Sequence, residues 1–203
     1  MTMAFREVSP ERLQFFSDGV FAVLITVLVL ELHAPSQGQW HSLTELWPEA
    51  ASYAVSYLFI AIVWVNHHHV FSYADRATPR LIWVNFAHLF TVSLLPFATS
   101  WVARTRMQGV PVCAYAAVFV MVNATYIALC NELVDRHAAV SKRARSMMRK
   151  RSLLTLTAFA AGGLLALWWH PLVGFGVICC CLLTYLRPEA GASATAASDS
   201  TSN

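Results

Sequence analysis

The feature that most constrains this chain is a succession of apolar segments, each close to the length of a helix that crosses a bilayer. A hydrocarbon core is about 30 Å thick, and a helix needs about 20 apolar residues to cross it. Four segments reach that length and two shorter ones follow, at about residues 13–32, 49–71, 81–103, 112–133, 153–169 and 171–186. We therefore expect an all-α integral membrane protein with six transmembrane helices.

The composition supports lipid as the surroundings of this surface. The chain is 57% hydrophobic and 12% charged, whereas soluble domains carry about 25% charged residues. One soluble core of this size cannot bury the surplus. Glu7 and Glu11 interrupt the basic leader that a cleavable signal peptide needs, and Glu31 stands where a small-residue cleavage site would be. We therefore expect the first span to remain in the mature protein.

Basic residues indicate the orientation in the membrane. They cluster in places that six spans bring to one side, namely Arg6 and Arg12, Arg76 and Arg80, the stretch 136–151, and Arg187. Seven of the fourteen Lys and Arg lie in that stretch, which we interpret as a cytoplasmic loop rather than a nucleic-acid site. Because Lys and Arg favour the cytoplasmic side, both termini should be cytoplasmic. Arg104 and Arg106 fall on the opposite side and are an exception.

The end of the chain differs from the rest. Residues 188–203 are rich in Ala, Ser, Gly and Thr. Such a composition cannot bury enough apolar surface to form a core. We expect one six-span domain over residues 1–187, followed by a disordered tail.

The first span has two faces with different chemistry. At about 100° per residue, one face of a helix carries the stripe Val23, Thr26, Val27 and Leu30. Asp18 falls roughly opposite. A carboxylate in a lipid-spanning helix is costly and normally has a partner, so we expect Asp18 to turn into the subunit. Periodicity leaves open whether the stripe lines a pore or packs against another helix.

The second span supplies partners for Asp18. Trp64 carries an indole N–H, and His67 and His68 lie within one turn of it. We expect a buried polar network made of Arg12, Ser17, Asp18, Trp64, His67, His68 and Asn85. Three consecutive histidines on a helix point in different directions, and no usual ligand lies one turn away, so no metal site is predicted. The roles of His69 and His88 stay open.

Three motifs follow one another along the first three spans. The first span contains Arg12-x-x-x-Phe16-Ser17-Asp18-Gly19-Val20-Phe21-Ala22, the second contains Trp64-x-x-His67-His68-x-x-Phe71, and the third contains Asn85 and Leu95-Pro96-Phe97. In this order they resemble the transmembrane protein 175 family of lysosomal and bacterial potassium channels. The resemblance covers about residues 12–100, and the remaining spans agree mainly in number and hydropathy.

The resemblance implies a homotetramer of six-span subunits whose first helices line a central pore, in a bacterial inner membrane. Its constrictions are hydrophobic: by position, Val23 would form one, Val27 and Leu30 would follow on later turns, and Thr26 would add a layer of hydroxyls. The residues bracing that helix would be Arg12, Phe16, Ser17, Asp18, Trp64, His67, His68 and Asn85. The permeant ion would be K⁺ in preference to Na⁺, with no cofactor. The family usually has Ile or Leu at the position of Val23, so the narrowest ring is left open.

The same residues allow a second class of function, and an enzyme is a third. The histidines and Asp18 suggest a proton-coupled membrane transporter. Transport sites usually lie near the midplane on broken helices, whereas these residues gather near one interface. The sequence has no P-loop, Rossmann glycine pattern or nucleophile–base set, so we predict no enzyme, and it lacks the TVGYG potassium filter. The five cysteines, including the run at 179–181, have no disulfide or zinc spacing, and the role of that run stays open.

Overall fold

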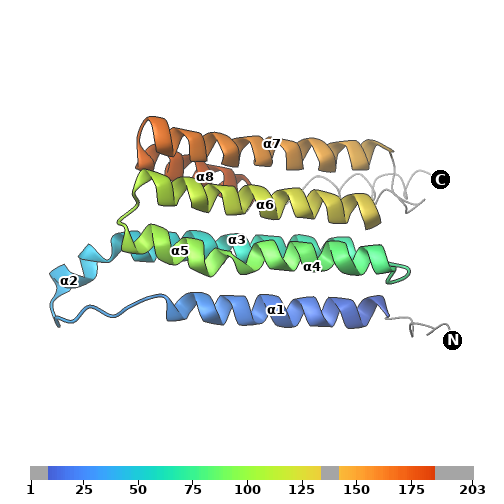
Figure 1. The fold of residues 1–203 in the computed structure, drawn as a ribbon, viewed down its shortest axis with the longest axis horizontal. Helices are drawn as coiled ribbons and strands as arrows, with labels where there is room; N and C mark the ends of the chain where they lie inside the picture. Colours follow the sequence, from blue (N-terminus) through green and yellow to red (C-terminus); the bar gives the residue numbers. More distant parts are fainter. Residues whose placement is uncertain (1–8, 134–141, 186–203) are drawn as a thin grey trace, which may run out of the picture.

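The computed structural model describes residues 9–133 and 142–185, and its long helices run side by side along one axis (Figure 1). The helices in chain order are α1 (Pro10–Leu30), α2 (Trp40–Glu45), α3 (Trp47–Phe71), α4 (Pro79–Ser93), α5 (Leu95–Arg104), α6 (Gly109–Leu133), α7 (Lys142–Trp168) and α8 (Pro171–Tyr185). The described residues contain no strand, so the predicted all-α fold is confirmed. The predicted tail at 188–203 lies outside the described residues.

Most of the helices match the predicted spans to within a few residues. The stretches long and apolar enough to cross a membrane, within the described residues, are Pro10–Leu30, Trp47–Phe71, Pro79–Arg104, Gly109–Leu133 and Ser146–Trp168. The sixth predicted span corresponds to α8, which is apolar but has only 15 residues. At 1.5 Å per residue its length is about 22 Å. Five of the six predicted spans therefore have full spanning length, and the last is shorter than a hydrocarbon core.

The third span is broken between α4 and α5. α4 ends at Ser93, and α5 begins at Leu95 with Pro96 in its first turn, where a missing N–H removes no helical hydrogen bond. The break therefore falls immediately before Pro96. The Ser93 hydroxyl donates to the carbonyl of Phe90, at 2.7 Å, within its own turn.

The basic stretch is the main correction to the sequence-based prediction. Residues 136–151 were interpreted as a loop, but α7 begins at Lys142 and includes the second half of that stretch. Lys, Arg, Met and Ala are strong helix formers, so this segment extends the apolar helix rather than separating it from its neighbour. Residues 134–141 lie outside the described part of the chain.

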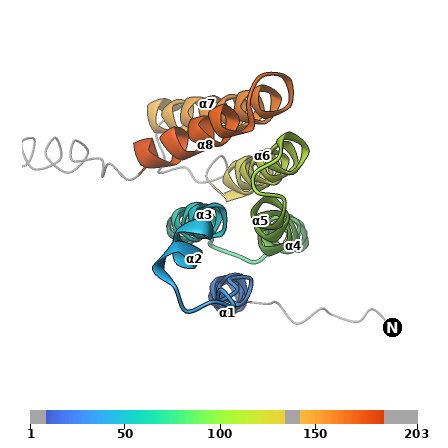
Figure 2. The same ribbon diagram turned by 90° about the vertical axis from the view of Figure 1, so that its left-hand side faces the viewer.

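α1 lies at one edge of the bundle, and this position determines how much of it is covered. Figure 2 shows α1 beside α3 and the α4–α5 pair, with α6, α7 and α8 on the far side of them. Its buried residues are Leu13, Ser17, Phe21, Leu24 and Leu28. These recur every three or four residues, so a single face of α1 meets the rest of the subunit.

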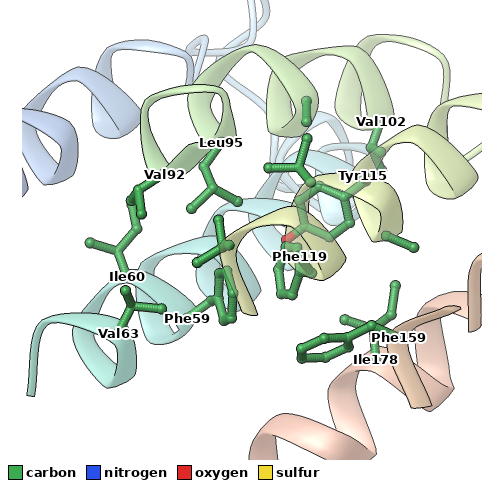
Figure 3. Packing of buried hydrophobic residues seen from close by; sticks show 14 of the residues in the cluster. Phe59, Ile60, Val63, Val92, Leu95, Val102, Tyr115, Phe119, Phe159 and Ile178 are labelled. Atoms are coloured by element: carbon green, nitrogen blue, oxygen red, sulfur yellow. The ribbon is translucent and has the colours of Figure 1, made fainter. Parts of the chain in front are cut away.

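The core that supports α1 combines stacked rings with one cluster of hydroxyls. Phe59 of α3 stacks on Phe119 of α6 with ring centroids 3.8 Å apart, and Phe159 of α7 packs edge-on against Phe119 (Figure 3). The buried Ser56 hydroxyl lies 2.7 Å from both the Thr99 and the Tyr115 hydroxyls. Both groups of contacts join α3 to α6, so the first half of the chain is fixed to the second.

The contact between α7 and α8 depends on the absence of side chains at two glycines. A Cβ atom at Gly174 would overlap the carbonyl oxygen of Gly162 and would also crowd Ala166. These are backbone atoms and a short methyl group, which cannot rotate away. The hairpin is therefore packed as closely as two helix backbones allow.

We predict that Gly174→Ala destabilises the protein by about 1–3 kcal/mol, because the added methyl group must push α8 away from α7. The thermal unfolding temperature in detergent measures this effect. Gly176→Ala is the matched control, since nothing lies within 4 Å of a Cβ atom there. Equal unfolding temperatures for the two variants would contradict the proposed close packing.

Candidate pore helix and its bracing network

The predicted apolar stripe lies on the face of α1 that the described helices leave uncovered. Val23 is 58% exposed, Val27 is 36% exposed and Leu30 is 75% exposed. Thr26 is exposed between them, and its hydroxyl donates to the Val23 carbonyl at 2.7 Å. The stripe therefore presents three aliphatic side chains and one hydroxyl oxygen on the uncovered part of the helix.

The side chain of Asp18 points toward α3. The indole N–H of Trp64 donates to Oδ1 of Asp18 at 2.9 Å. The acceptor is a carboxylate, and charge-assisted hydrogen bonds of this kind are stronger than neutral ones. Asp18 is half-buried. This contact fixes α1 to α3 near the start of the helix.

A second connection runs from α1 through α4 to α3. The Asn85 amide nitrogen donates to the Ser17 hydroxyl at 2.9 Å, and its oxygen lies 2.8 Å from Nε2 of His67. An amide oxygen only accepts, so Nε2 of His67 carries the hydrogen in this contact. Ser17 donates its own hydrogen to the Leu13 carbonyl at 2.9 Å. Ser17, His67 and Asn85 are fully buried, and these contacts provide hydrogen-bond partners for the Ser17 hydroxyl, the Asn85 amide and Nε2 of His67. Nδ1 of His67 has no hydrogen-bond partner among the described residues.

His68 reaches α1 through a residue that the sequence analysis missed. Its Nδ1 lies 2.9 Å from the amide nitrogen of Gln14. The signal was available, because Gln14 lies four residues before Asp18 and so on the same side of the helix. We define the bracing network as the contacts Asp18–Trp64, Ser17–Asn85–His67 and Gln14–His68.

His88 belongs to a neighbouring cluster rather than to the bracing network. Its Nδ1 lies 3.0 Å from the Thr125 hydroxyl, which in turn lies 3.0 Å from the Thr91 hydroxyl. The rings of His88 and His67 are nearly parallel with centroids 5.9 Å apart. The ring contact joins α4 to α3, and the contact with Thr125 joins α4 to α6. Neither threonine was singled out from the sequence.

Two of the predicted bracing residues lie at the edge of this arrangement. Arg12 is exposed, and its side chain makes no hydrogen bond or ion pair with any residue that the structure describes. Phe16 is half exposed and packs its ring against Phe86 of α4, with centroids 5.4 Å apart. His69 makes an edge-on contact with Tyr73 and stays outside the network. Among the described residues, no group of His, Cys, Asp and Glu could hold a metal ion.

We predict that Asn85→Ala lowers stability by about 1–3 kcal/mol, because the buried Nε2–H of His67 loses its acceptor. The Ser17 hydroxyl loses one donor but keeps its hydrogen bond to the Leu13 carbonyl. The unfolding temperature in detergent, measured together with Ser17→Ala and the double variant, tests whether the two residues act as one unit. Ser93→Ala is the control, because its exposed hydroxyl bonds only within its own helix. An Asn85→Ala variant as stable as the Ser93→Ala variant would contradict the network.

Comparisons with known proteins agree with this geometry. The family described as endosomal/lysosomal potassium channel TMEM175 matches residues 12–96. A potassium channel of Chryseobacterium sp. (strain P1-3) is 31% identical over 178 residues, which cover 88% of this chain and 93% of the relative. The endosomal/lysosomal proton channel TMEM175 of Gallus gallus is 31% identical over 103 residues, 45% of this chain and 21% of that protein.

A solved structure matches nearly the whole fold. The crystal structure of a lysosomal potassium-selective channel TMEM175 homologue from Chamaesiphon minutus superposes with a TM-score of 0.73 at 27% sequence identity. The match covers 88% of this chain and 98% of that one. The family match falls on α1 to α5, the helices that carry the stripe and the bracing network. The chain is an integral membrane protein and belongs to the TMEM175 family.

Proposed function

We propose that this protein is a potassium-selective cation channel, which conducts ions passively through a pore lined by the α1 helices of four subunits. The proposal rests on the two different faces of α1. The stripe of Val23, Thr26, Val27 and Leu30 is uncovered, whereas the contacts of the bracing network are made by residues on another face of the helix. The potassium channels among its relatives support the choice of ion.

One helix cannot enclose a pore, so the proposal requires an oligomer. In a closed ring of identical subunits, each residue of the stripe becomes a ring of residues around the symmetry axis. Exposed apolar side chains alone would not distinguish a pore from a lipid-facing surface. The bracing network adds the distinction, because it holds α1 in one rotation and directs its polar side chains away from the stripe.

Hydrophobic rings select ions through the energy of dehydration. An apolar ring narrower than a hydrated ion excludes water or strips part of the ion's shell. K⁺ holds its shell less tightly than Na⁺ and so passes such a ring at lower cost. The oxygen of Thr26 offsets part of the loss. Val23 is smaller than the Ile or Leu usual in the family, so Val27 and Leu30 share the constriction with it.

The proposed location is a bacterial inner membrane with both termini on the cytoplasmic side. α1 begins and α8 ends at the same end of the bundle (Figure 1). Arg80 and the basic first turns of α7 lie at that end too. Arg80 forms an ion pair of 3.1 Å with the buried Glu132. This distribution supports the orientation, since basic residues favour the cytoplasmic side.

We predict that Val23→Asn and Val27→Asn each raise the K⁺ flux of purified protein in liposomes, by about tenfold if the change removes 1.4 kcal/mol from the barrier. An amide at the constriction offers the ion partners that an aliphatic side chain lacks. Val65→Asn is the matched control, because Val65 is exposed on α3 and is not part of the stripe. Unchanged flux and selectivity in both stripe variants would exclude the stripe as the ion path.

The ion and the mode of transport are tested by bi-ionic recording of the same purified protein. We expect current without a pH gradient and a reversal potential that favours K⁺ over Na⁺. A proton-coupled transporter, the alternative function, would show flux that needs or dissipates a pH gradient. A reversal potential that follows the proton gradient alone would contradict potassium selectivity.

We further predict that Asp18→Ala and Trp64→Phe reduce the tetrameric fraction, measured by light scattering after extraction in mild detergent. Each variant removes one side of the same hydrogen bond, so α1 is no longer held in the rotation that subunit contact requires. The double variant should have a tetrameric fraction similar to that of either single variant, since all three lose the same hydrogen bond. Fully tetrameric, conducting single variants would contradict this role.

A further inference from the structure

The end of the stripe carries an ion pair that the bracing network does not include. Glu31 caps α1 immediately after Leu30. Its carboxylate lies 3.9 Å from Nη2 of Arg104, the last residue of α5. The side chain of Glu31 is 33% exposed and that of Arg104 is 67% exposed. α1 and α5, whose ends carry the pair, both end at the end of the bundle opposite the basic start of α7 (Figure 1).

The turn after Arg104 holds it in this position through an unusual backbone. Arg106 and Met107 both have left-handed backbone angles, with φ of 50° and 60°. Residues other than glycine adopt this conformation at a cost and keep it where the surrounding structure requires it. Met107 is buried in the core, and the Thr105 hydroxyl donates to the Trp101 carbonyl at 2.6 Å. The turn that follows α5 is therefore held by the burial of Met107 and by a hydrogen bond within the last turn of the helix.

Stability does not explain why this pair is present. An exposed ion pair contributes about 0–1 kcal/mol, and 3.9 Å is long for a direct hydrogen bond. Arginine is also disfavoured on this side of the membrane by the distribution of basic residues elsewhere in the chain. A role in the electrostatic potential of the pore fits better, because potential depends on charge and distance rather than on close contact.

Of the acidic residues at this end of the bundle, Glu31 is the one that directly follows the stripe. The described residues there include three acids, Glu31, Glu45 and Glu49, and two arginines, Arg104 and Arg106. Glu31 is one residue from the stripe, a rise of about 1.5 Å along the helix. This is well inside the Debye length of about 8 Å at physiological ionic strength. Glu45 lies 3.4 Å from His41 on the separate helix α2.

We propose that the Glu31–Arg104 pair sets the cation concentration at the outer mouth of the pore, with Glu31 attracting K⁺ and Arg104 limiting that attraction. The inference rests on the proposed function, since four copies of α1 convert Glu31 into a ring of four carboxylates. Each carboxylate has its own Arg104 from the same subunit. The net charge that the pairs contribute to the mouth is then close to zero.

The test measures single-channel K⁺ conductance of purified protein in planar bilayers. We expect Arg104→Gln to raise the conductance about twofold or more at roughly 20 mM KCl, and Glu31→Gln to lower it by a similar factor, because mouth charge sets local ion concentration. The double variant Glu31→Gln/Arg104→Gln should return close to wild type. All differences should shrink near 1 M KCl, where the Debye length is about 3 Å.

Conductance changes of opposite sign in the two single variants distinguish an electrostatic role of the pair from a structural one. A merely structural pair would make both single variants change in the same direction and leave the double variant no better, and that result would overturn the inference. Arg106→Gln is the matched control, because it removes an equal charge from the same end of the bundle but leaves the Glu31–Arg104 pair intact. Its effect on conductance should be smaller than that of Arg104→Gln.

The two proposals fail in different ways. Wild-type protein that passes no cation current would overturn the proposed function and this inference together. Wild-type protein that conducts, with variants of unchanged conductance, would overturn this inference alone.

Discussion

The structure depends on the two-sided hydrogen bonding of Asn85. A hydrocarbon interior offers no water to an unpaired polar group, so polar side chains inside a membrane protein must find partners within the protein. The Asn85 amide gives a donor to Ser17 of α1 and an acceptor to His67 of α3. These contacts fix the rotation of α1, with Asp18–Trp64 as a second point of attachment. The direction in which the apolar stripe faces follows from that rotation.

This arrangement divides one helix into parts with different physical roles. The first half of α1 carries the polar side chains of the bracing network, and the second half carries the aliphatic stripe. In the proposed channel, the polar residues stay off the ion path and the ion meets hydrophobic rings. Glu31 follows the last ring directly, so the helix ends with a charge. Dehydration and electrostatic attraction would then act in succession along one element.

The two halves of the bundle are built by different rules. α1, α3, α4 and α5 share an apolar cluster and in addition the polar contacts of the bracing network, and they lie in the region that matches the family. α7 and α8 approach each other through glycines, with Gly174 against Gly162. The halves meet where Phe59 stacks on Phe119 and where Ser56 contacts Tyr115. We infer that α6, α7 and α8 act as a rigid support, which keeps α3 in place behind the pore helix.

The sequence by itself determined the helical spans, the apolar stripe on the first helix, and the residue types that hold that helix from behind. These features are local, because hydropathy and helical period are read within one segment. Only the tertiary structure decided which donor meets which acceptor, since Trp64 and Asp18 are 46 residues apart and Asn85 and Ser17 are 68 apart. Such pairs depend on the relative depth and rotation of separate helices. For the same reason Gln14 joins His68 while Arg12 stays exposed, and Arg104, an exception in the sequence, lies beside Glu31.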